Sequence, residues 1–301
     1  MNCLICGESF KEKGNYHKSC LKKVFDTDET PEIDLKLSDI NIEAQKMAGK
    51  LSISGVQPKV SVRLNKEKNK IEAAAEGGEY ILKPQSQTFY NLPENEWTCT
   101  ILARKMEIDV PSFALIKLKD ESLAYIVKRF DRSRGDKIHV EDFGQILEKK
   151  DKYKGSYEEI GKKLKTISEI PGLDVQLLFE RILFYYIIGN GDAHLKNFSI
   201  RYEDNGLIRL APAYDIVSSK ILIKDEEDFA LTLNGKKNNI KKTDFYSFNG
   251  YLGINKKYTD EVFKKYINSE ALLGGIVNIN NDISSKLGKI IKERVNNFNK
   301  G

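Results

Sequence analysis

The part of the chain that most constrains its fold is a Gly-flanked loop containing an aspartate and an asparagine five positions apart. An apolar run, residues 177–188, precedes the loop, which contains Asp192 and Asn197. A second acid, Asp215, follows eighteen residues after Asn197. Carboxylate and amide oxygens are the ligands that Mg²⁺ accepts in proteins. The pattern therefore predicts a loop that holds a metal ion beside a further aspartate.

The same spacing, Asp-x4-Asn followed by a second Asp, is typical of phosphoryl-transfer sites. In such a site Asp192 would orient and deprotonate an acceptor hydroxyl, while Asn197 and Asp215 would hold Mg²⁺ against nucleotide phosphates. We expect Lys196 to neutralise charge on the transferred group. His194 completes the candidate catalytic set, and we expect it to fix the loop by hydrogen bonds.

Upstream of this loop, the sequence predicts short strands and one helix. A serine- and glycine-containing segment leads into an alternating run, residues 60–64, which predicts a strand. Such a segment can fold over nucleotide phosphates through its N–H groups, and an ordinary hairpin turn is the alternative. Lys83 ends a second β-type run and could reach phosphates or face solvent. A helix is predicted over residues 94–107, in which either Glu94 or Glu96 could pair with Lys83.

The order of the predicted elements indicates an α+β, bilobal, protein-kinase-like fold with a β-rich N-lobe and a helical C-lobe. Further β-type runs at residues 112–118 and 123–128 end in a polar stretch where we expect the hinge. Beyond it, helices are predicted at 142–150, 157–167 and 173–188. His139 is expected to cap the first of these helices, and the acidic stretch 26–40 is interpreted as a linker. We expect three parts: a cysteine-rich segment 1–25, an N-lobe 26–130 and a C-lobe 131–301.

Three of the four cysteines lie in the first twenty residues, which is not the distribution of a disulfide framework. Two close pairs, Cys3 with Cys6 and His17 with Cys20, have the spacing of a tetrahedral Zn²⁺ site with three thiolates and one imidazole. A reduced tail with incidental cysteines is the alternative. Four protein ligands would leave no open coordination position, so the predicted zinc knuckle is structural.

Cys99 belongs to a different pattern, because it shares one helical stripe with Leu102, Ala103 and Met106. This spacing predicts a buried, structural cysteine.

Composition narrows the class of protein. Hydrophobic residues make up 40% and charged residues 31% of the 301 residues, as in ordinary globular proteins. The net charge of +5 is too small to indicate nucleic-acid binding by itself. Neither a signal peptide nor a membrane-spanning run is evident, so we expect a cytoplasmic protein with no membrane contact.

Seven motifs occur in the order found in HipA-like kinases, which are serine/threonine kinase toxins of bacterial toxin–antitoxin modules. They are SISGVQPK at 52–59, YILKP at 80–84, ENE at 94–96, VKRFDR at 127–132, HVED at 139–142, GDAHLKN at 191–197 and YD at 214–215. The resemblance covers the chain from about residue 31 onward.

The resemblance implies ATP and Mg²⁺ as cofactors, with Asp192 as the catalytic aspartate. It implies a nucleotide-binding set made of a phosphate loop, a strand lysine and an adenine-contacting hinge: Ser54, Gly55, Val56, Gln57, Lys59, Lys83, Lys128, Arg129 and Phe130. It further implies autophosphorylation of Ser52 or Ser54, which would eject the loop from the ATP site. A phosphoserine beside ATP phosphates is repelled by their charge, so this switch is physically sensible.

The chain differs from the long HipA type because it lacks an N-terminal subdomain of roughly a hundred residues. With two serines in its loop, it is more similar to the short HipT type of three-component modules. The resemblance implies HipS-like and HipB-like antitoxin partners, an aminoacyl-tRNA synthetase as substrate, and DNA contact only through a partner. Two alternatives stay open: a small-molecule kinase with the same acid–amide–acid set, and a catalytically silent binding or regulatory protein.

Overall fold

The computed structural model describes residues 2–11, 14–38, 40, 57–133, 136–204 and 206–300. The chain divides into two compact units. Unit 1 comprises Met1–Ile101, Pro111–Asp136 and Val277–Asn280, and unit 2 comprises Leu102–Val110, Lys137–Ile276 and Asn281–Gly301.

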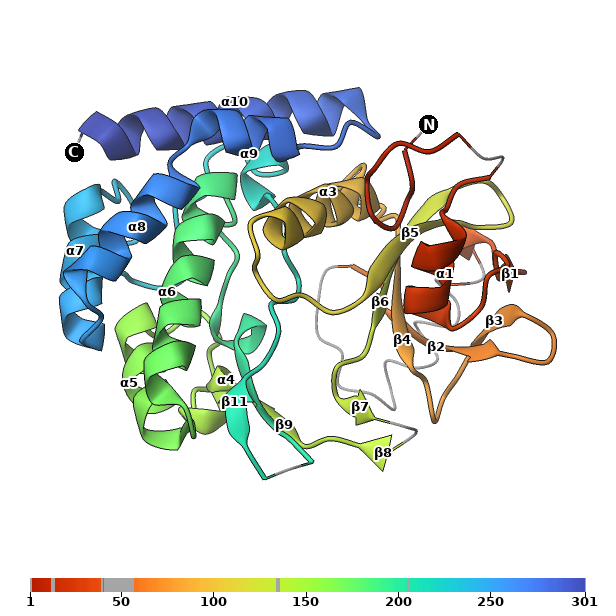
Figure 1. Cartoon of the computed structure of the whole chain (residues 1–301), viewed down its shortest axis with the longest axis horizontal. Helices are drawn as coiled ribbons and strands as arrows, with labels where there is room; N and C mark the ends of the chain where they lie inside the picture. The colour runs from red at the N-terminus through yellow and green to blue at the C-terminus, as the bar shows by residue number, and fades with distance from the viewer. Residues whose placement is uncertain are drawn as a thin grey trace. The chain divides into compact units, whose positions relative to one another are not determined.

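Unit 1 is built around a six-stranded sheet (Figure 1). In spatial order its strands are β1 (Glu32–Ile33), β3 (Lys70–Ala73), β2 (Val60–Asn65), β4 (Tyr80–Pro84), β6 (Leu123–Lys128) and β5 (Phe113–Lys117). Neighbouring strands pair antiparallel, except that β1 pairs parallel with β3. The four strands predicted from alternating or β-branched runs are confirmed, because each run supplies apolar side chains for the core.

The first helix of unit 1, α1 (Lys18–Phe25), packs on the core of this sheet. Leu21, Val24 and Phe25 of α1 belong to one buried cluster with Val62 and Leu82 of the sheet. Residues near the N-terminus therefore gain their apolar burial from the sheet and not from a core of their own.

The predicted long helix is α3 (Leu92–Lys105). The four residues of its expected stripe, Cys99, Leu102, Ala103 and Met106, are all buried. Cys99 donates a hydrogen bond from its thiol to Asn95 Oδ1 at 3.4 Å. The prediction that Cys99 is a structural, buried cysteine is confirmed.

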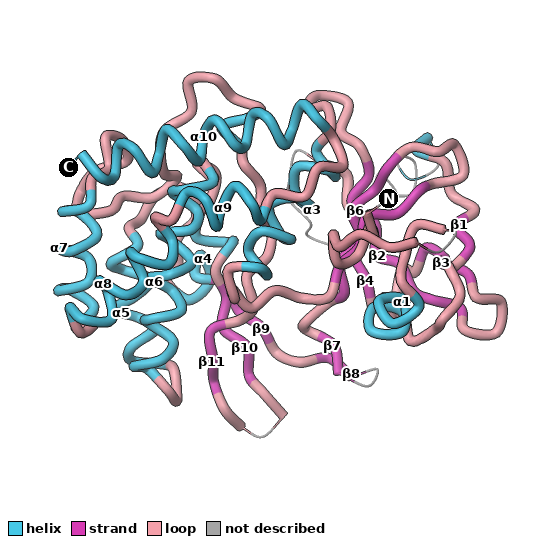
Figure 2. Tube along the Cα trace, turned by 45° about the horizontal axis from the view of Figure 1, so that its top comes forward, coloured by secondary structure: helices cyan, strands magenta, loops and turns pink. Residues whose placement is uncertain are grey.

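Unit 2 is mainly helical. Its α-helices are α4 (Phe143–Ile146), α5 (Tyr157–Ile167), α6 (Pro171–Ile188), α7 (Lys242–Leu252), α8 (Lys256–Tyr266), α9 (Ser269–Gly275) and α10 (Asn281–Lys300). A three-stranded antiparallel sheet in unit 2 has the order β11 (Ile208–Leu210), β10 (Ser199–Tyr202), β9 (Val140–Asp142). At the end of the second segment of unit 1, β7 (Arg132–Ser133) pairs with β8 (Asp136–Lys137). Figure 2 shows β9, β10 and β11 grouped below the helices.

Helix α6 is the centre of unit 2, and most of its side chains are buried. Its rings join an aromatic cluster in which Phe179 contacts Phe245, Phe248 and Phe263. Proline at its first position and Gly189 in the left-handed conformation after its last turn define its ends. A helix that is apolar on nearly every side must be enclosed by other helices, which is why the run before the loop is so apolar.

Two expectations about the segment near β9 are wrong. The predicted helix over residues 142–150 is only the four-residue α4, because the polar residues after Leu147 offer no apolar face to bury. Its cap is Asp142, whose carboxylate accepts from the N–H of Gln145 in a capping box. His139 Nε2 instead lies 3.5 Å from Glu141 Oε2, and its ring contacts the ring of Tyr202.

The expectation of a linker over residues 26–40 is also wrong in part. Strand β1 lies within it, and Ile33, Leu35 and Leu37 pack against the core of the sheet. These apolar residues alternate with charged ones, so the polar composition of the segment gave no indication that they are buried.

None of the helices in the described part of the chain combines the length and apolar character needed to cross a bilayer.

Candidate active site and cysteine–histidine cluster

The loop after α6 is fixed by backbone hydrogen bonds at its start. The N–H of Asn190 donates to Tyr185 O at 2.9 Å, and the N–H of Gly191 donates to Ser219 Oγ at 2.8 Å. Gly191 has no space for a side chain, because a Cβ there would lie 2.5 Å from the carbonyl oxygen of Glu227. The glycine before Asp192 is therefore required by close backbone approach.

Asp192 is exposed at the surface of unit 2, and one of its carboxylate oxygens has a fixed partner. The hydroxyl of Tyr153 donates to Asp192 Oδ1 at 2.9 Å. The Tyr153 ring also meets the edge of the His194 ring, with centroids 5.2 Å apart. Tyr153 was not among the predicted site residues, since it lies in an irregular segment 39 positions before Asp192.

The two predicted Mg²⁺ ligands lie together. Asn197 Nδ2 donates to Asp215 Oδ2 at 3.5 Å, and Asn197 Oδ1 accepts from the N–H of His194 at 3.0 Å. An amide oxygen has two lone pairs, so Asn197 Oδ1 retains one for a cation. Asp215 has a positive φ of 53°, a conformation that Asp tolerates better than most residues. Mg²⁺ takes oxygen ligands, so Asn197 Oδ1 and the Asp215 carboxylate are the candidate ligands of this pair.

His194 holds the loop through its backbone and not through its ring. Its N–H makes the bond to Asn197, whereas its ring Nδ1 is buried without a hydrogen-bond partner. Burial, together with the charge of Lys152, lowers the pKa of His194 to about 4. The ring is therefore neutral near pH 7, and the hydrogen bonds that His194 makes within the loop come from its backbone N–H and carbonyl.

The side chain of Lys196 is exposed, whereas its backbone carbonyl has a hydrogen-bond partner from another segment. Its carbonyl accepts from the hydroxyl of Tyr214 at 2.7 Å, and that hydroxyl also lies 2.5 Å from Ser199 Oγ. Tyr214 directly precedes Asp215, so one ring joins the two segments of the candidate site.

Glu226 is a further acid beside the loop that sequence reasoning missed. Its Oε2 is buried without a hydrogen-bond partner, and a Cβ on Gly191 would lie 2.6 Å from that atom. Burial, together with the charge of Asp192, raises the pKa of Glu226 to about 7. Glu226 is thus poised between its neutral and charged forms at physiological pH.

In unit 1 the predicted strand lysine has a helix glutamate as its partner. Lys83 on β4 lies with its Nζ 2.5 Å from Glu96 Oε1 on α3, and both side chains are almost fully buried. The Nζ also lies 5.5 Å from the ring centroid of Tyr125. Of the two candidate partners of Lys83, the structure therefore shows Glu96. Burial raises the pKa of the other candidate, Glu94.

The phosphate loop is only partly described. Ser52, Ser54, Gly55 and Val56 lie outside the described residues, so their predicted roles stay predictions. Gln57 is described, and its Nε2 donates to Pro84 O at 2.8 Å at the end of β4. Lys59 is also described, and it directly precedes β2.

The predicted hinge, Lys128 to Phe130, continues from β6. The N–H of Lys128 donates to Ser112 O at 2.7 Å, and the N–H of Arg129 donates to Glu79 O at 2.8 Å. An adenine contact through either N–H would require one of these bonds to break. The Arg129 guanidinium pairs with Asp131, which fixes its direction.

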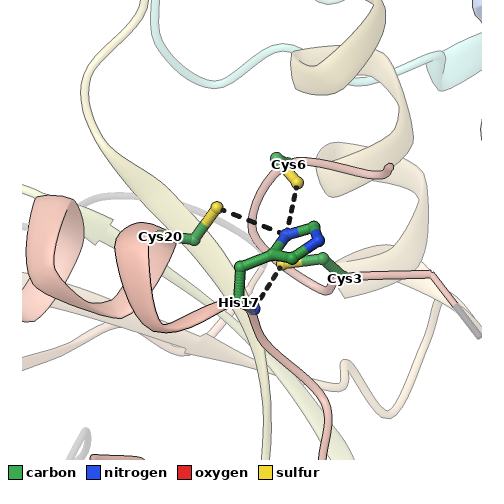
Figure 3. Close-up of side chains that lie close together, drawn as sticks. All are labelled: Cys3, Cys6, His17 and Cys20. Carbon is green, nitrogen blue, oxygen red and sulfur yellow. Dashed lines mark hydrogen bonds between the residues drawn. The ribbon is translucent and has the colours of Figure 1, made fainter. Parts of the chain in front are cut away.

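The four predicted zinc ligands converge on one point (Figure 3). Their ligand atoms, the Sγ atoms of Cys3, Cys6 and Cys20 and a ring nitrogen of His17, all lie within 4.8 Å of one another. Cys6 Sγ is 3.3 Å and Cys20 Sγ is 3.7 Å from His17 Nδ1, and the N–H of His17 points to Cys3 Sγ at 3.4 Å. The cysteines are free thiols.

Comparison with known proteins places the chain in a family. The HipA-like C-terminal domain matches residues 51–271, which is more than half of the chain. The chain belongs to the HipA-like family. The match includes Lys83, Asp192, Asn197 and Asp215, and it leaves out the cysteine–histidine cluster.

HipA-like relatives of known sequence are named as kinases. Y4dM of Sinorhizobium fredii, named “Putative kinase”, is 37% identical over 213 residues, covering 65% of this chain and 52% of its own length. A Haemophilus influenzae protein with the same description is 34% identical, covering 60% and 55%. The serine/threonine-protein kinase toxin HipA of Shewanella oneidensis is 26% identical, covering 62% and 47%. This chain therefore spans about half the length of these curated relatives.

Two solved structures of kinases or kinase toxins have a similar fold. Shewanella oneidensis HipA, in a complex with HipB and operator DNA, matches with a TM-score of 0.70 and 20% identity, covering 83% of this chain and 65% of that chain. The Helicobacter pylori proinflammatory kinase CtkA matches with a TM-score of 0.54 and 15% identity, covering 79% and 94%. The predicted α+β, kinase-like fold is confirmed, while the HipT subtype stays a prediction.

Proposed function

We propose that this chain is an ATP-dependent protein serine/threonine kinase that acts as the toxin of a bacterial toxin–antitoxin module. The observation that carries the proposal is the loop after α6. It presents an exposed Asp192 whose carboxylate is oriented by Tyr153, and it brings Asn197 to Asp215. The buried ion pair of Lys83 with Glu96 is a second, independent kinase-like feature.

Asp192 is proposed to orient and deprotonate the acceptor hydroxyl. Tyr153 occupies its Oδ1, and the structure shows no bond from a described residue to its other oxygen, so that oxygen would accept the proton. The hydroxyl oxygen then bonds to the γ-phosphorus of ATP, the bond to the β-phosphate oxygen breaks, and ADP leaves.

Asn197 and Asp215 are the groups that would hold Mg²⁺, which when bound neutralises charge on the phosphates. Lys83 is proposed to bind phosphate oxygens, with Glu96 holding its ammonium in place. Lys196 would stabilise charge on the transferred group, since it is exposed and follows Asp192 by four positions in the same loop. The segments 54–59 and 128–130 are proposed to bind the phosphates and the adenine.

We further propose, from family membership, that Ser52 or Ser54 is autophosphorylated. The proposed substrate is an aminoacyl-tRNA synthetase, and the proposed partners are HipS-like and HipB-like antitoxins. The solved HipA structure contains HipB and operator DNA, which supports a HipB-like partner that makes the DNA contact. Copurification of the chain with the products of its neighbouring genes tests the partners directly.

Intact-mass spectrometry after incubation with Mg²⁺ and ATP tests the kinase. We expect a gain of one or two phosphates that map to Ser52 or Ser54 and that are lost in Asp192→Asn. Asp204→Asn is the matched control, because Asp204 is an exposed acid in the turn after β10. ATP turnover without a mass gain would favour a small-molecule kinase. Neither turnover nor ATP binding would favour a silent binding protein.

A further inference from the structure

The cysteine–histidine cluster lies outside the region that matches the HipA-like family, and the proposed reaction does not use it. Two loop cysteines, Cys3 and Cys6, face His17 and Cys20 at the start of α1 (Figure 3). His17 is the N-cap residue of α1, yet its side chain makes no capping bond and turns toward the thiols. Three thiols and an imidazole meeting at one point indicate a cation-binding site.

The distances agree with a tetrahedral zinc ion. With Zn–S near 2.3 Å and Zn–N near 2.0–2.1 Å, tetrahedral angles place a sulfur and a nitrogen ligand about 3.6 Å apart. The observed distances from His17 Nδ1 to the Sγ atoms of Cys6 and Cys20, 3.3 and 3.7 Å, lie on either side of this value. A thiol-rich, nitrogen-containing set favours Zn²⁺ over Mg²⁺ or Ca²⁺, which prefer oxygen.

The loop between the first two cysteines is tied to the rest of unit 1. Leu4 O accepts from Trp97 Nε1 of α3 at 2.7 Å and from the N–H of Leu115 of β5 at 2.8 Å. Tyr16, next to His17, donates from its hydroxyl to Leu115 O at 3.1 Å. Gly7 is packed so closely that a Cβ would lie 2.7 Å from Val277 Cγ2. The loop therefore joins the start of α1 to both α3 and β5.

We propose that Cys3, Cys6, His17 and Cys20 bind one structural Zn²⁺ ion, and that this ion clamps helix α3 to strand β5 through the carbonyl of Leu4. All four coordination positions belong to the protein, so the ion has no open position for substrate. A segment this short has no separate core, so its conformation depends on the ion. Without zinc, the Cys3–Cys6 loop would lose the shape that presents Leu4 O to Trp97.

The clamp has a consequence that rests on the proposed kinase function. Trp97 directly follows Glu96 in α3, and Glu96 is the partner of Lys83. Holding Trp97 in place therefore helps to hold the Glu96 carboxylate toward the Lys83 ammonium. Zinc would act here as a positioning element for the phosphate-binding lysine and would take no part in the reaction.

Trp97 is the only tryptophan of the chain, so its fluorescence reports on the clamp directly. The first measurement is the zinc content of the purified full chain by elemental analysis, followed by Trp97 emission and thermal unfolding before and after treatment with a zinc chelator. We expect about one zinc per chain. We expect chelation to shift the emission to longer wavelength, lower the melting temperature by about 5–10 °C, and be reversed by added Zn²⁺.

Variants separate the site from a general folding defect. Cys20→Ser should lower the zinc content to less than about one fifth of the wild-type value. His17→Cys should retain zinc, because four thiolates also form a structural zinc site. Cys99→Ser is the matched control, since Cys99 is the one cysteine outside the cluster and serine can keep its bond to Asn95.

Wild-type protein that holds no zinc, whether or not zinc is supplied, would overturn the site. Zinc that leaves without changing Trp97 emission or the melting temperature would overturn the clamp. None of these readouts requires phosphoryl transfer. If zinc-loaded protein passes them but gains no phosphate from ATP, the proposed kinase function fails and the zinc site stands. If the kinase is active and zinc removal leaves ATP affinity unchanged, the link to Glu96 fails.

Discussion

The ammonium of Lys83 and the carboxylate of Glu96 lie 2.5 Å apart, with only 4% and 3% of their side chains exposed. Two charges so deeply buried depend on each other, because removal of one leaves the other unpaired in a poorly solvating environment. We therefore expect Lys83→Met to lower the free energy of unfolding by about 3–5 kcal/mol and to abolish ATP binding. Urea unfolding and nucleotide titration measure the two effects.

The double variant Lys83→Met with Glu96→Leu should recover most of this stability, since an apolar pair can replace a buried ion pair. ATP binding should stay absent, because the ammonium that we propose to bind phosphate is gone. Glu94→Gln is the matched control on the same helix turn, and it should leave ATP affinity unchanged. Recovery of ATP binding in the double variant would contradict the role given to Lys83.

Tyr153 is expected to set the orientation of Asp192. Tyr153→Phe removes one hydrogen bond to a charged group at an exposed position, so kcat should fall about tenfold with a small change in KM. The stability should change by less than about 1 kcal/mol. Tyr90→Phe, at a residue that is 79% exposed, provides the control. An unaltered kcat would show that Asp192 is oriented without Tyr153.

Glu226 should make the stability of the chain depend on pH. Between pH 4.5 and about 7 the folded chain retains a proton on Glu226 that the unfolded chain has released, because burial raises its pKa to about 7. Stability therefore falls as the pH rises through this window and levels off above it. The full shift corresponds to about 3 kcal/mol, which partial exposure reduces to about 1–2 kcal/mol.

Glu226→Gln should remove this contribution, so the variant should lose less stability than wild type between pH 5 and pH 8. Urea unfolding at the two pH values measures the difference. Glu227→Gln is the matched control. Glu227 is the neighbouring acid, and its exposed side chain contacts Lys237 and Asn238 at the surface. Equal pH dependence in wild type and Glu226→Gln would exclude Glu226 as its source.

Gly191 should not tolerate a side chain. The Cβ of Gly191→Ala would meet the carbonyl oxygen of Glu227 at 2.5 Å, and a backbone atom cannot move away as a flexible side chain can. We expect a loss of about 2 kcal/mol or more, together with loss of activity through displacement of Asp192. Gly250→Ala in α7 meets no atom within 4 Å and should instead stabilise by about 0.5–1 kcal/mol. Calorimetry of both variants measures the contrast.

Local patterns predicted most of the regular structure. The strands β2, β4, β5 and β6 and the helices α3, α5 and α6 arise where runs of apolar residues have a clear period or a clear end. Helix α4 was predicted too long because the capping signal at Asp142 is strong while the stretch after it has no apolar face. The two-residue strand β1 depends on pairing with β3, which lies nearly forty positions away, so no local signal marks it.

The candidate site was predictable where its residues share a short segment. Asp192, Asn197 and Asp215 follow a recognisable spacing, and the structure brings Asn197 to Asp215. Which of Glu94 and Glu96 pairs with Lys83 depends on how α3 is rotated about its own axis. Because α3 is buried on several sides, its sequence has no single apolar face that would indicate this rotation. Tyr153 and Glu226 reach the loop from separate irregular segments, and only tertiary structure shows their contacts with it.

The left-handed backbone at Asp215 limits how this chain could lose its activity by mutation. Asparagine and glycine adopt a φ of 53° at little cost, whereas alanine or a branched residue would strain the turn. Both tolerated replacements are one nucleotide away from an aspartate codon. A change at position 215 that removes the proposed kinase activity while the chain still folds should therefore be to Asn or Gly.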